Sequence, residues 1–183
     1  MLKPFNECLR LGLTPGLEKD IRTQFPKETG MLVAQVVLPQ GPSSTKIENG
    51  DVLSKVNGEL ITQFVCLDSM LDDNVGNLVT FSMQHAGEVL DIKLNIGDLH
   101  AITPDRFVSV AEAKFHDLSY QLARRYAIAL KDPGVYVSET TSSFPSSNAT
   151  GSLIQEVDNQ PTPNLDAFIE VMKMIPDKKR VVI

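Results

Sequence analysis

Cysteine is scarce in this chain of 183 residues, in which Cys8 and Cys66 are the only two. Two cysteines do not form a disulfide framework, and no His or Cys lies at ligand spacing from another, which excludes a zinc site of ordinary pattern. The sequence therefore predicts no metal, and its cysteine usage fits a reducing compartment. Phosphate-binding loops and dinucleotide-binding fingerprints are also missing, so no cofactor is expected.

Basic residues are outnumbered, with 17 Lys and Arg against 23 Asp and Glu and a net charge of −6. A protein without a basic surplus has little to neutralise phosphates with, so no nucleic-acid partner is expected. No stretch approaches the roughly 18 apolar residues of a membrane helix. Residues 1–5 lack the apolar core of a signal peptide. A membrane partner is therefore not expected either.

Motifs that present a catalytic nucleophile are missing as well. The chain contains no Gly-x-Ser-x-Gly and no Gly-Asn-Ser-Gly segment. The histidines His85, His100 and His116 fall in a predicted turn, a linker and the start of a helix, without an evident Ser or Cys partner. We therefore expect that this chain is not itself an enzyme.

The most informative stretch that is present runs from residue 30 to residue 58. An apolar run at 31–37, preceded by Gly30, predicts a buried strand, and a Pro/Gly/Ser connector follows it at 39–44. A second strand starts after Gly50 and ends at Asn57 and Gly58. That pair is favoured in tight reverse turns because both residues tolerate φ > 0.

Other segments around this stretch predict further elements. Thr14 and Pro15 have the pattern of an N-cap followed by proline in the first helical position, directly after a short strand at 11–14. Apolar residues at a spacing of four predict a helix to residue 25, and a second helix is expected at 64–71. Strands are expected at 78–83 and 89–96, joined by a turn at 85–88.

The pattern repeats at an offset of about one hundred residues. The later part of the chain contains, in the same order, equivalents of the first helix stripe, the 31–37 strand, the Pro/Ser loop, the 50–58 segment and the second helix face. They are Leu118, Leu122 and Tyr126; residues 134–139; residues 142–147; residues 151–159; and Leu165, Phe168, Ile169 and Met172. The alternative is two unrelated α/β segments.

The repeat predicts two domains, at 1–98 and 105–183, with a linker at 99–104. The second copy is expected to be truncated at its C-terminus, because residues 180–183 match only the start of strand 78–83 and nothing matches 89–96. Such a domain has an unpaired edge. The simpler interpretation is that the given sequence stops short of this strand, and the alternative is that another chain or segment supplies it.

The segment Gly-Asp-Val-Leu-Ser-Lys-Val-Asn-Gly at 50–58, with the strand and loop before it, resembles the core of PDZ domains in HtrA-family serine proteases. Residues 97–104, 115–121 and 2–8 resemble, more narrowly, the fungal nuclear HtrA-like proteases, which are pro-apoptotic and have a duplicated protease-plus-PDZ architecture. The resemblance implies an α+β fold of tandem PDZ-like domains, each a small, partly open antiparallel β-barrel or sandwich with two helices.

A PDZ domain captures a peptide by strand addition and binds its terminal carboxylate in a nest of backbone N–H groups. The resemblance places such a nest at Leu11, Gly12 and Leu13, with Arg10 near enough to favour an anion. The inward face of the second helix would line the pocket. The candidate peptide-binding residues are Arg10, Leu11, Gly12, Leu13, Phe64, Leu67 and Leu71. Alternatively, the leucines only form core.

Two departures from the PDZ pattern weaken the predicted grooves. Pro15 lacks an N–H and would shorten the peptide-pairing strand of the first copy. In the second copy the nest position reads Glu112, Ala113 and Lys114, with no glycine and with a carboxylate that repels another. The second copy is therefore expected to act in packing or interaction. Tyr120 and Tyr126, on a predicted helix, are expected in its core, and the alternative is that they are contact residues.

The chain is thus interpreted as a non-catalytic tandem PDZ fragment of an HtrA-type serine endopeptidase. It would bind hydrophobic C-terminal chain ends through the first domain. The alternative is a pair of degenerate PDZ domains that pack on the protease domains or mediate oligomerisation without binding peptide. The expected partners are C-terminal or hydrophobic peptide segments and the protease domains of the same protein, with an oligomer possible. Resemblance alone suggests the nucleus, and a cytoplasmic location stays open.

Overall fold

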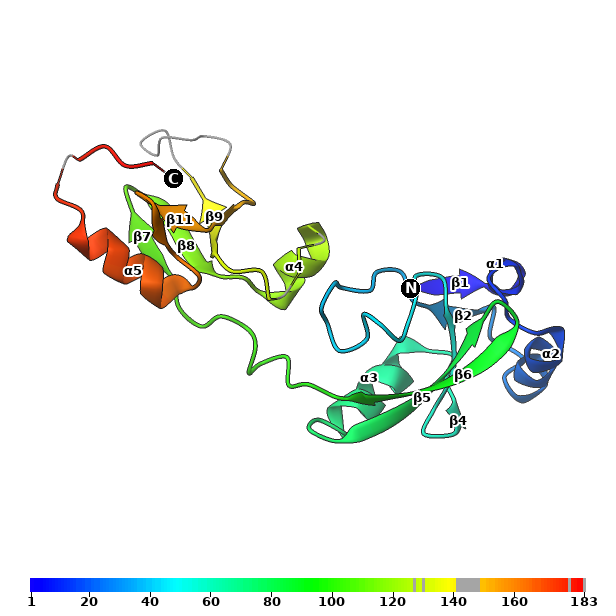
Figure 1. Ribbon diagram of the computed structural model, residues 1–183. Coiled ribbons are helices and arrows are strands. Elements are labelled where there is room, and N and C mark those ends of the chain that lie inside the picture. The colour runs from blue at the N-terminus through cyan, green and yellow to red at the C-terminus, as the bar shows by residue number, and fades with distance from the viewer. Residues whose placement is uncertain (127, 130, 141–148, 178, 183) are drawn as a thin grey trace. The chain divides into compact units, whose positions relative to one another are not determined.

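The computed structural model of the chain describes residues 1–126, 128–129, 131–140, 149–177 and 179–182. The chain divides into two compact units, Met1–Asp98 and Leu99–Ile183 (Figure 1). Antiparallel sheets and helices occur in both units, so the predicted α+β class is confirmed. Among the described residues, no helix is long and apolar enough to cross a membrane.

The first unit, Met1–Asp98, is built on a six-stranded antiparallel sheet in the order β1-β2-β3-β5-β6, with β4 paired to β3. Its strands are β1 (Leu2–Pro4), β2 (Gly30–Val33), β3 (Val52–Val56), β4 (Glu59–Leu60), β5 (Leu78–His85) and β6 (Glu88–Asn95). The helices are α1 (Phe5–Arg10), α2 (Pro15–Gln24) and α3 (Phe64–Asp72).

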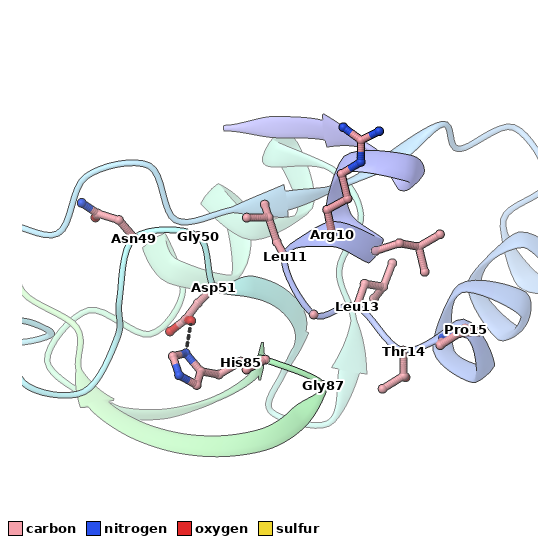
Figure 2. A pocket seen from close by; sticks show the side chains of 13 residues that line it. Arg10, Leu11, Leu13, Thr14, Pro15, Asn49, Gly50, Asp51, His85 and Gly87 are labelled. Carbon is pink, nitrogen blue, oxygen red and sulfur yellow. Dashed lines mark hydrogen bonds and ion pairs between the residues drawn. The ribbon is translucent and has the colours of Figure 1, made fainter.

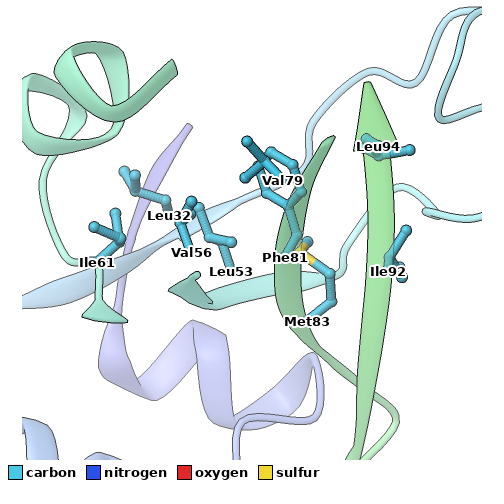
Figure 3. Close-up of a cluster of buried hydrophobic side chains, with 9 residues drawn as sticks. All are labelled: Leu32, Leu53, Val56, Ile61, Val79, Phe81, Met83, Ile92 and Leu94. Carbon is cyan, nitrogen blue, oxygen red and sulfur yellow. The ribbon is translucent and has the colours of Figure 1, made fainter. Parts of the chain in front are cut away.

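Successive residues of β2 and β3 alternate between the two faces of this sheet, as the pleat requires. Leu32 and Leu53 join one hydrophobic cluster (Figure 3), against which α3 packs through Leu67 and Leu71. We call this side the α3 face. The neighbouring residues Met31, Val33 and Val52 join a second cluster, which holds Phe5 and Cys8 of α1 and Ile21 of α2. This is the α1 face.

Elements with a clear pattern of their own were predicted correctly in this unit. The predicted helices correspond to α2 and α3, and the predicted strands to β3, β5 and β6. Asn57 and Gly58 both have positive φ in the turn between β3 and β4, as expected. β2 ends at Val33, earlier than the predicted 31–37 strand, although Ala34 still exchanges hydrogen bonds with Gly50 and Asp51.

The strand expected at 11–14 is wrong, because the chain there leaves α1 through a turn and enters α2. The edge strand is instead β1, in a segment that carried no periodic signal. Leu2 pairs with Leu32 and Pro4 with Gly30, so β1 closes one side of the sheet. Gly30 is required at this point, because a Cβ built there would lie 1.9 Å from the carbonyl oxygen of Lys3.

The second unit, Leu99–Ile183, has a four-stranded antiparallel sheet in the order β10-β9-β8-β7 and a two-stranded ribbon of β11 and β12. The strands are β7 (Val108–Val110), β8 (Ala113–Asp117), β9 (Val135–Glu139), β10 (Leu153–Ile154), β11 (Glu156–Val157) and β12 (Gln160–Pro161). α4 (Tyr120–Tyr126) and α5 (Leu165–Met174) complete it. Phe115 of β8 and Phe168 of α5 are fully buried, with ring centroids 4.8 Å apart.

The predicted elements of the second copy are found at α4, β9 and α5, and its 151–159 segment forms two very short strands. β7 and β8 were not predicted. The repeated Pro/Ser loop at 142–147 lies outside the described residues. Residues 180–182 form no strand, although the carbonyl oxygen of Val182 accepts a hydrogen bond of 2.8 Å from the N–H of Asp158. Ile183 lies outside the description.

Candidate functional site

A pocket of about 530 Å³ opens on the first unit where three connections meet (Figure 2). One wall is the chain that leaves α1 and enters α2. The second is the approach to β3, and the third is the turn between β5 and β6. The lining residues are Leu9, Arg10, Leu11, Gly12, Leu13, Thr14, Pro15, Asn49, Gly50, Asp51, His85, Ala86 and Gly87. We call it the α1 pocket.

The first wall is fixed by the way in which α1 ends. The N–H of Leu11 donates to the carbonyl oxygens of Glu7 and Cys8 at 3.1 Å, and the N–H of Gly12 donates to Leu9 at 3.3 Å. The N–H of Leu13 donates to the carbonyl oxygen of Cys8 at 2.9 Å. All three amides thus satisfy the last carbonyls of α1, as is usual where a glycine with positive φ terminates a helix.

This hydrogen bonding corrects the predicted carboxylate nest. A nest needs successive N–H groups that point freely toward an anion. The amides of Leu11, Gly12 and Leu13 already donate to the backbone of α1, so they are not free to bind a terminal carboxylate. The sequence pattern was interpreted as a strand-opening loop, whereas it is the C-terminal cap of a six-residue helix.

Gly12 has a different and well-defined role in the pocket. Its φ is +109°, and a Cβ built on it would lie 2.6 Å from the backbone nitrogen of Ala86. The turn between β5 and β6 therefore packs directly on Gly12, which holds two walls of the pocket together. Only glycine permits both this approach and this backbone conformation.

His85 and Asp51 form the polar side of the pocket. His85 Nδ1 lies 2.7 Å from Asp51 Oδ1, and Asp51 is 3% exposed, with its other oxygen accepting from the N–H of Glu48 at 2.9 Å. The hydrogen bond to Asp51, and then its charge, raise the pKa of His85 above the ordinary 6.5. The imidazole of His85, held against a buried carboxylate, thus lines the same pocket as Arg10.

The structure brings four of the predicted site residues together. Arg10, Leu11, Gly12 and Leu13 all line the α1 pocket. Leu13 is 3% exposed and belongs to the core of the α1 face, so for this residue the alternative interpretation holds. Leu11 is half-buried and Leu9 is exposed.

The other three predicted residues lie elsewhere, since Phe64, Leu67 and Leu71 belong to α3 and none of them lines the α1 pocket. Leu67 and Leu71 pack on the opposite face of the sheet, and Phe64 is exposed. The prediction of one groove formed by both groups is wrong for this geometry, because the sheet separates them.

Sequence reasoning missed the pair of His85 and Asp51, which are 34 positions apart. Asp51 was noted only as the start of a strand, and His85 only as part of a turn. No short-range spacing connects them, because their contact depends on the pairing of β3 with β5.

In the second unit, the residues aligned with the predicted nest lie in a β-hairpin. Ala111 and Glu112 form the turn between β7 and β8, and Ala113 and Lys114 belong to β8. Lys114 forms an ion pair with Glu139 at 2.5 Å. No loop of the nest type is formed here.

The predicted core position of Tyr126 is wrong, since this side chain is 44% exposed. Its ring lies 6.1 Å from that of Tyr136, a buried tyrosine of β9, and Tyr120 is half-buried. Burial, followed by the hydrogen bond with Tyr126, raises the pKa of Tyr136 to about 12.

A second pocket, of about 390 Å³, lies within the second unit. Arg106, Phe107, His116 and Ser119 are among the residues that line it. In the part of the chain that the structure describes, no group of three or more His, Cys, Asp or Glu side chains could hold a metal ion.

Comparison with known proteins bears on both units. The family described as "PDZ-like domain" matches residues 101–178. This match falls within the second unit. Over its whole length, the chain is 69% identical to part of the pro-apoptotic serine protease NMA111 of Phaeosphaeria nodorum. It is 59% identical to part of the protein of that name in Chaetomium globosum and 55% to that in Pyricularia oryzae.

The predicted resemblance is thereby confirmed. The chain spans 18% of the length of these relatives. The relatives are named as proteases, and the chain matches only part of each of them.

Proposed function

We propose that both units are PDZ-like and that together they form a recognition region of an HtrA-type protease. Three pairs of corresponding hydrogen bonds support the internal repeat. Ile61 donates to Ser54 as Thr162 donates to Gln155, and Asn57 donates to Thr80 as Asp158 donates to Val182. Gly50 donates to Ala34 as Gly151 donates to Val137. All of these donors are offset by 101 positions, the interval that also separates Phe64 and Leu165, where α3 and α5 begin.

We further propose that the first unit binds hydrophobic C-terminal chain ends at the α1 pocket. The observation that carries this proposal is the composition of the pocket, whose lining combines exposed Leu9 and half-buried Leu11 with Arg10 and His85. An apolar side chain and a terminal carboxylate need these two surfaces side by side.

The chemistry differs from capture by an amide nest. Arg10 presents a guanidinium that can bind a carboxylate through two parallel hydrogen bonds, and it forms no ion pair with any described residue. His85 adds positive charge when it is protonated, and Asp51 favours that form by raising the pKa of His85 above its ordinary value. Side-chain charge thus takes the place of the backbone N–H groups of Leu11, Gly12 and Leu13, which donate to carbonyl oxygens of α1.

The test is a titration with peptides that end in an apolar residue and carry either a free or an amidated C-terminus. Amidation should weaken binding by at least about tenfold, as should Arg10→Gln. Lys27→Gln is the charge-matched control, because Lys27 is exposed and lies outside the pocket. Chemical shifts should change at Leu9, Leu11 and His85. Equal binding of the two peptides would refute the proposal.

A second candidate function, a purely structural role, is favoured for the second unit by one observation. The outer edge of β8, where an added strand would pair, is already covered by β7. This unit would then pack on the protease domains without binding peptide. The same titration tests it, since peptides should leave residues 113–117 unperturbed.

We also propose that the chain has no proteolytic activity of its own and serves protease domains elsewhere in the protein. Incubation of the purified chain with an unfolded protein substrate should give no cleavage. Cleavage that disappears in a His85→Gln variant would contradict this proposal and assign the His85–Asp51 pair a catalytic role.

A further inference from the structure

The described part of the chain contains four two-residue hairpin turns in which both residues have positive φ. They are Asn57 and Gly58, Ala86 and Gly87, Ala111 and Glu112, and Asp158 and Asn159. This conformation is accessible to glycine at no cost and is tolerated by Asn and Asp. Three of the turns contain such residues. The turn between β7 and β8 has none, with φ of 48° at Ala111 and 63° at Glu112.

The strand that this strained turn holds in place is short and lies at an edge. β7 contains three residues and pairs only with β8, in the register Val108–Phe115, Ser109–Lys114 and Val110–Ala113. Val108 and Val110 are half-buried against the core of the second unit. Just before β7, Arg106 Nη2 lies 2.6 Å from Asp166 Oδ2 at the start of α5, and both side chains are exposed.

We propose that β7 exchanges between two copies of this chain, so that β7 of each copy pairs with β8 of the other. The exchange opens the turn at Ala111 and Glu112, which then adopt extended backbone and lose their strain. Every cross-strand contact of β7 is recovered in the second copy, because the same residues meet in the same register. Short hinge turns under strain favour this kind of exchange.

A second copy fits this edge better than an unrelated peptide does. A foreign strand must displace β7, which the two-residue turn holds at a high effective concentration, and it leaves Val108 and Val110 exposed. Reciprocal exchange leaves β8 of both copies paired on both sides. The inference does not depend on the α1 pocket, which belongs to the first unit.

Two variant chains provide the test, both with Cys66→Ser, so that the exposed native thiol is removed and only the buried Cys8 remains beside the introduced cysteine. One carries Ser109→Cys and the other Lys114→Cys, which are exposed cross-strand partners. Neither chain can form this disulfide within itself. After mixing at high concentration and oxidation, we expect a disulfide between the two different chains, with a mass of two chains.

The matched control uses Thr80→Cys in one chain and Lys93→Cys in the other, in the same background. These residues are cross-strand partners in the hairpin of β5 and β6, in which each strand has eight residues and the turn contains Gly87. This hairpin is long and its turn is relaxed, so no mixed disulfide is expected. A mixed disulfide of equal yield in the control would show random collision and overturn the inference.

A turn variant measures the role of strain. Ala111→Asn combined with Glu112→Gly introduces the pair found between β3 and β4, which should raise the dimer dissociation constant by at least about tenfold. Light scattering on the otherwise native chain gives this constant. The inference fails if the chain stays monomeric at all concentrations while one chain with both Ser109→Cys and Lys114→Cys oxidises internally. It also fails if the turn variant dimerises as well as the native chain.

Discussion

Gly12 couples the end of α1 to the turn between β5 and β6, and substituting it should disturb both. Gly12→Ala introduces a Cβ 2.6 Å from the nitrogen of Ala86 at a φ of +109°. We expect a loss of at least about 2 kcal/mol in the free energy of unfolding, measured by urea denaturation.

Gly16 in α2 provides the control for this substitution. A Cβ at Gly16 meets nothing within 4 Å, and the residue is helical. Gly16→Ala should therefore stabilise the first unit by about 0.5 kcal/mol, because alanine loses less backbone entropy in a helix. A similar loss in both variants would mean that close packing on Ala86 is not the cause.

His85 makes the stability of the first unit depend on pH. Its pKa is raised in the folded chain by the hydrogen bond to Asp51 and by that carboxylate's charge. The stabilisation is therefore fully present below the ordinary value of 6.5 and is lost as pH rises through the raised value.

Thermal unfolding between about pH 5.5 and 8.5 measures this effect, a window that spans the ordinary histidine pKa. The difference in Tm between the native chain and His85→Gln should be largest at the acidic end and should shrink as pH rises. In an Asp51→Asn background, the difference in Tm caused by His85→Gln should no longer depend on pH. A difference that grows with pH would contradict the assigned sign.

At this scale, the sequence identified residues that are contiguous in the chain. Arg10, Leu11, Gly12 and Leu13 reach one pocket because they are neighbours, and Gly12 was correctly singled out, although for a different role. The partnership of His85 with Asp51 could not be predicted, since it depends on the register between two strands.

At the scale of elements, α5 and α2 begin in different ways. Asn164 precedes α5, and its Oδ1 accepts a hydrogen bond of 2.9 Å from the N–H of Ala167. Thr14 precedes α2, as the sequence predicted, but its side chain makes no capping hydrogen bond.

Asn164→Ala should therefore cost about 1 kcal/mol of unfolding free energy, the usual value of a satisfied N-cap. Thr14→Ala should cost clearly less, because Thr14 makes no capping hydrogen bond and the fixed φ of Pro15 still initiates the helix. Both values follow from denaturant titrations of the single variants. Equal costs would show that the hydrogen bond from Ala167 to Asn164 adds no stability beyond the intrinsic preference of Asn for the N-cap position.

The elements that the sequence revealed are those with enough residues to show a period. α2 and α3 display their apolar stripes, and β5 alternates over eight residues. α1 has six residues and β1 and β7 have three each, so a period of 3.6 or 2 cannot be recognised in them. Their conformation is determined by what they pair with or pack on.

At the scale of the molecule, the two units have separate hydrophobic cores. Phe81 belongs to the cluster under α3 in the first unit, and Phe168 to the cluster under α5 in the second. Nothing in either cluster is shared with the other. The two units should therefore unfold as separate cooperative transitions.

Phe81→Ala and Phe168→Ala test this independence. Each should lower the stability of its own unit by about 3 kcal/mol and leave the other unit within about 0.5 kcal/mol. Hydrogen exchange monitored residue by residue distinguishes the two units. A loss of protection in both units after either substitution would show that they unfold together.

The labelling rates of the two cysteines report on motions of the first unit. Cys8 is fully buried on the α1 face, where burial raises the pKa of its thiol, whereas Cys66 on α3 is exposed. An alkylating reagent should thus label Cys66 at once and reach Cys8 only when α1 detaches from the sheet. The ratio of the two labelling rates reports how often α1 opens, and hence how often the wall of the α1 pocket is rebuilt.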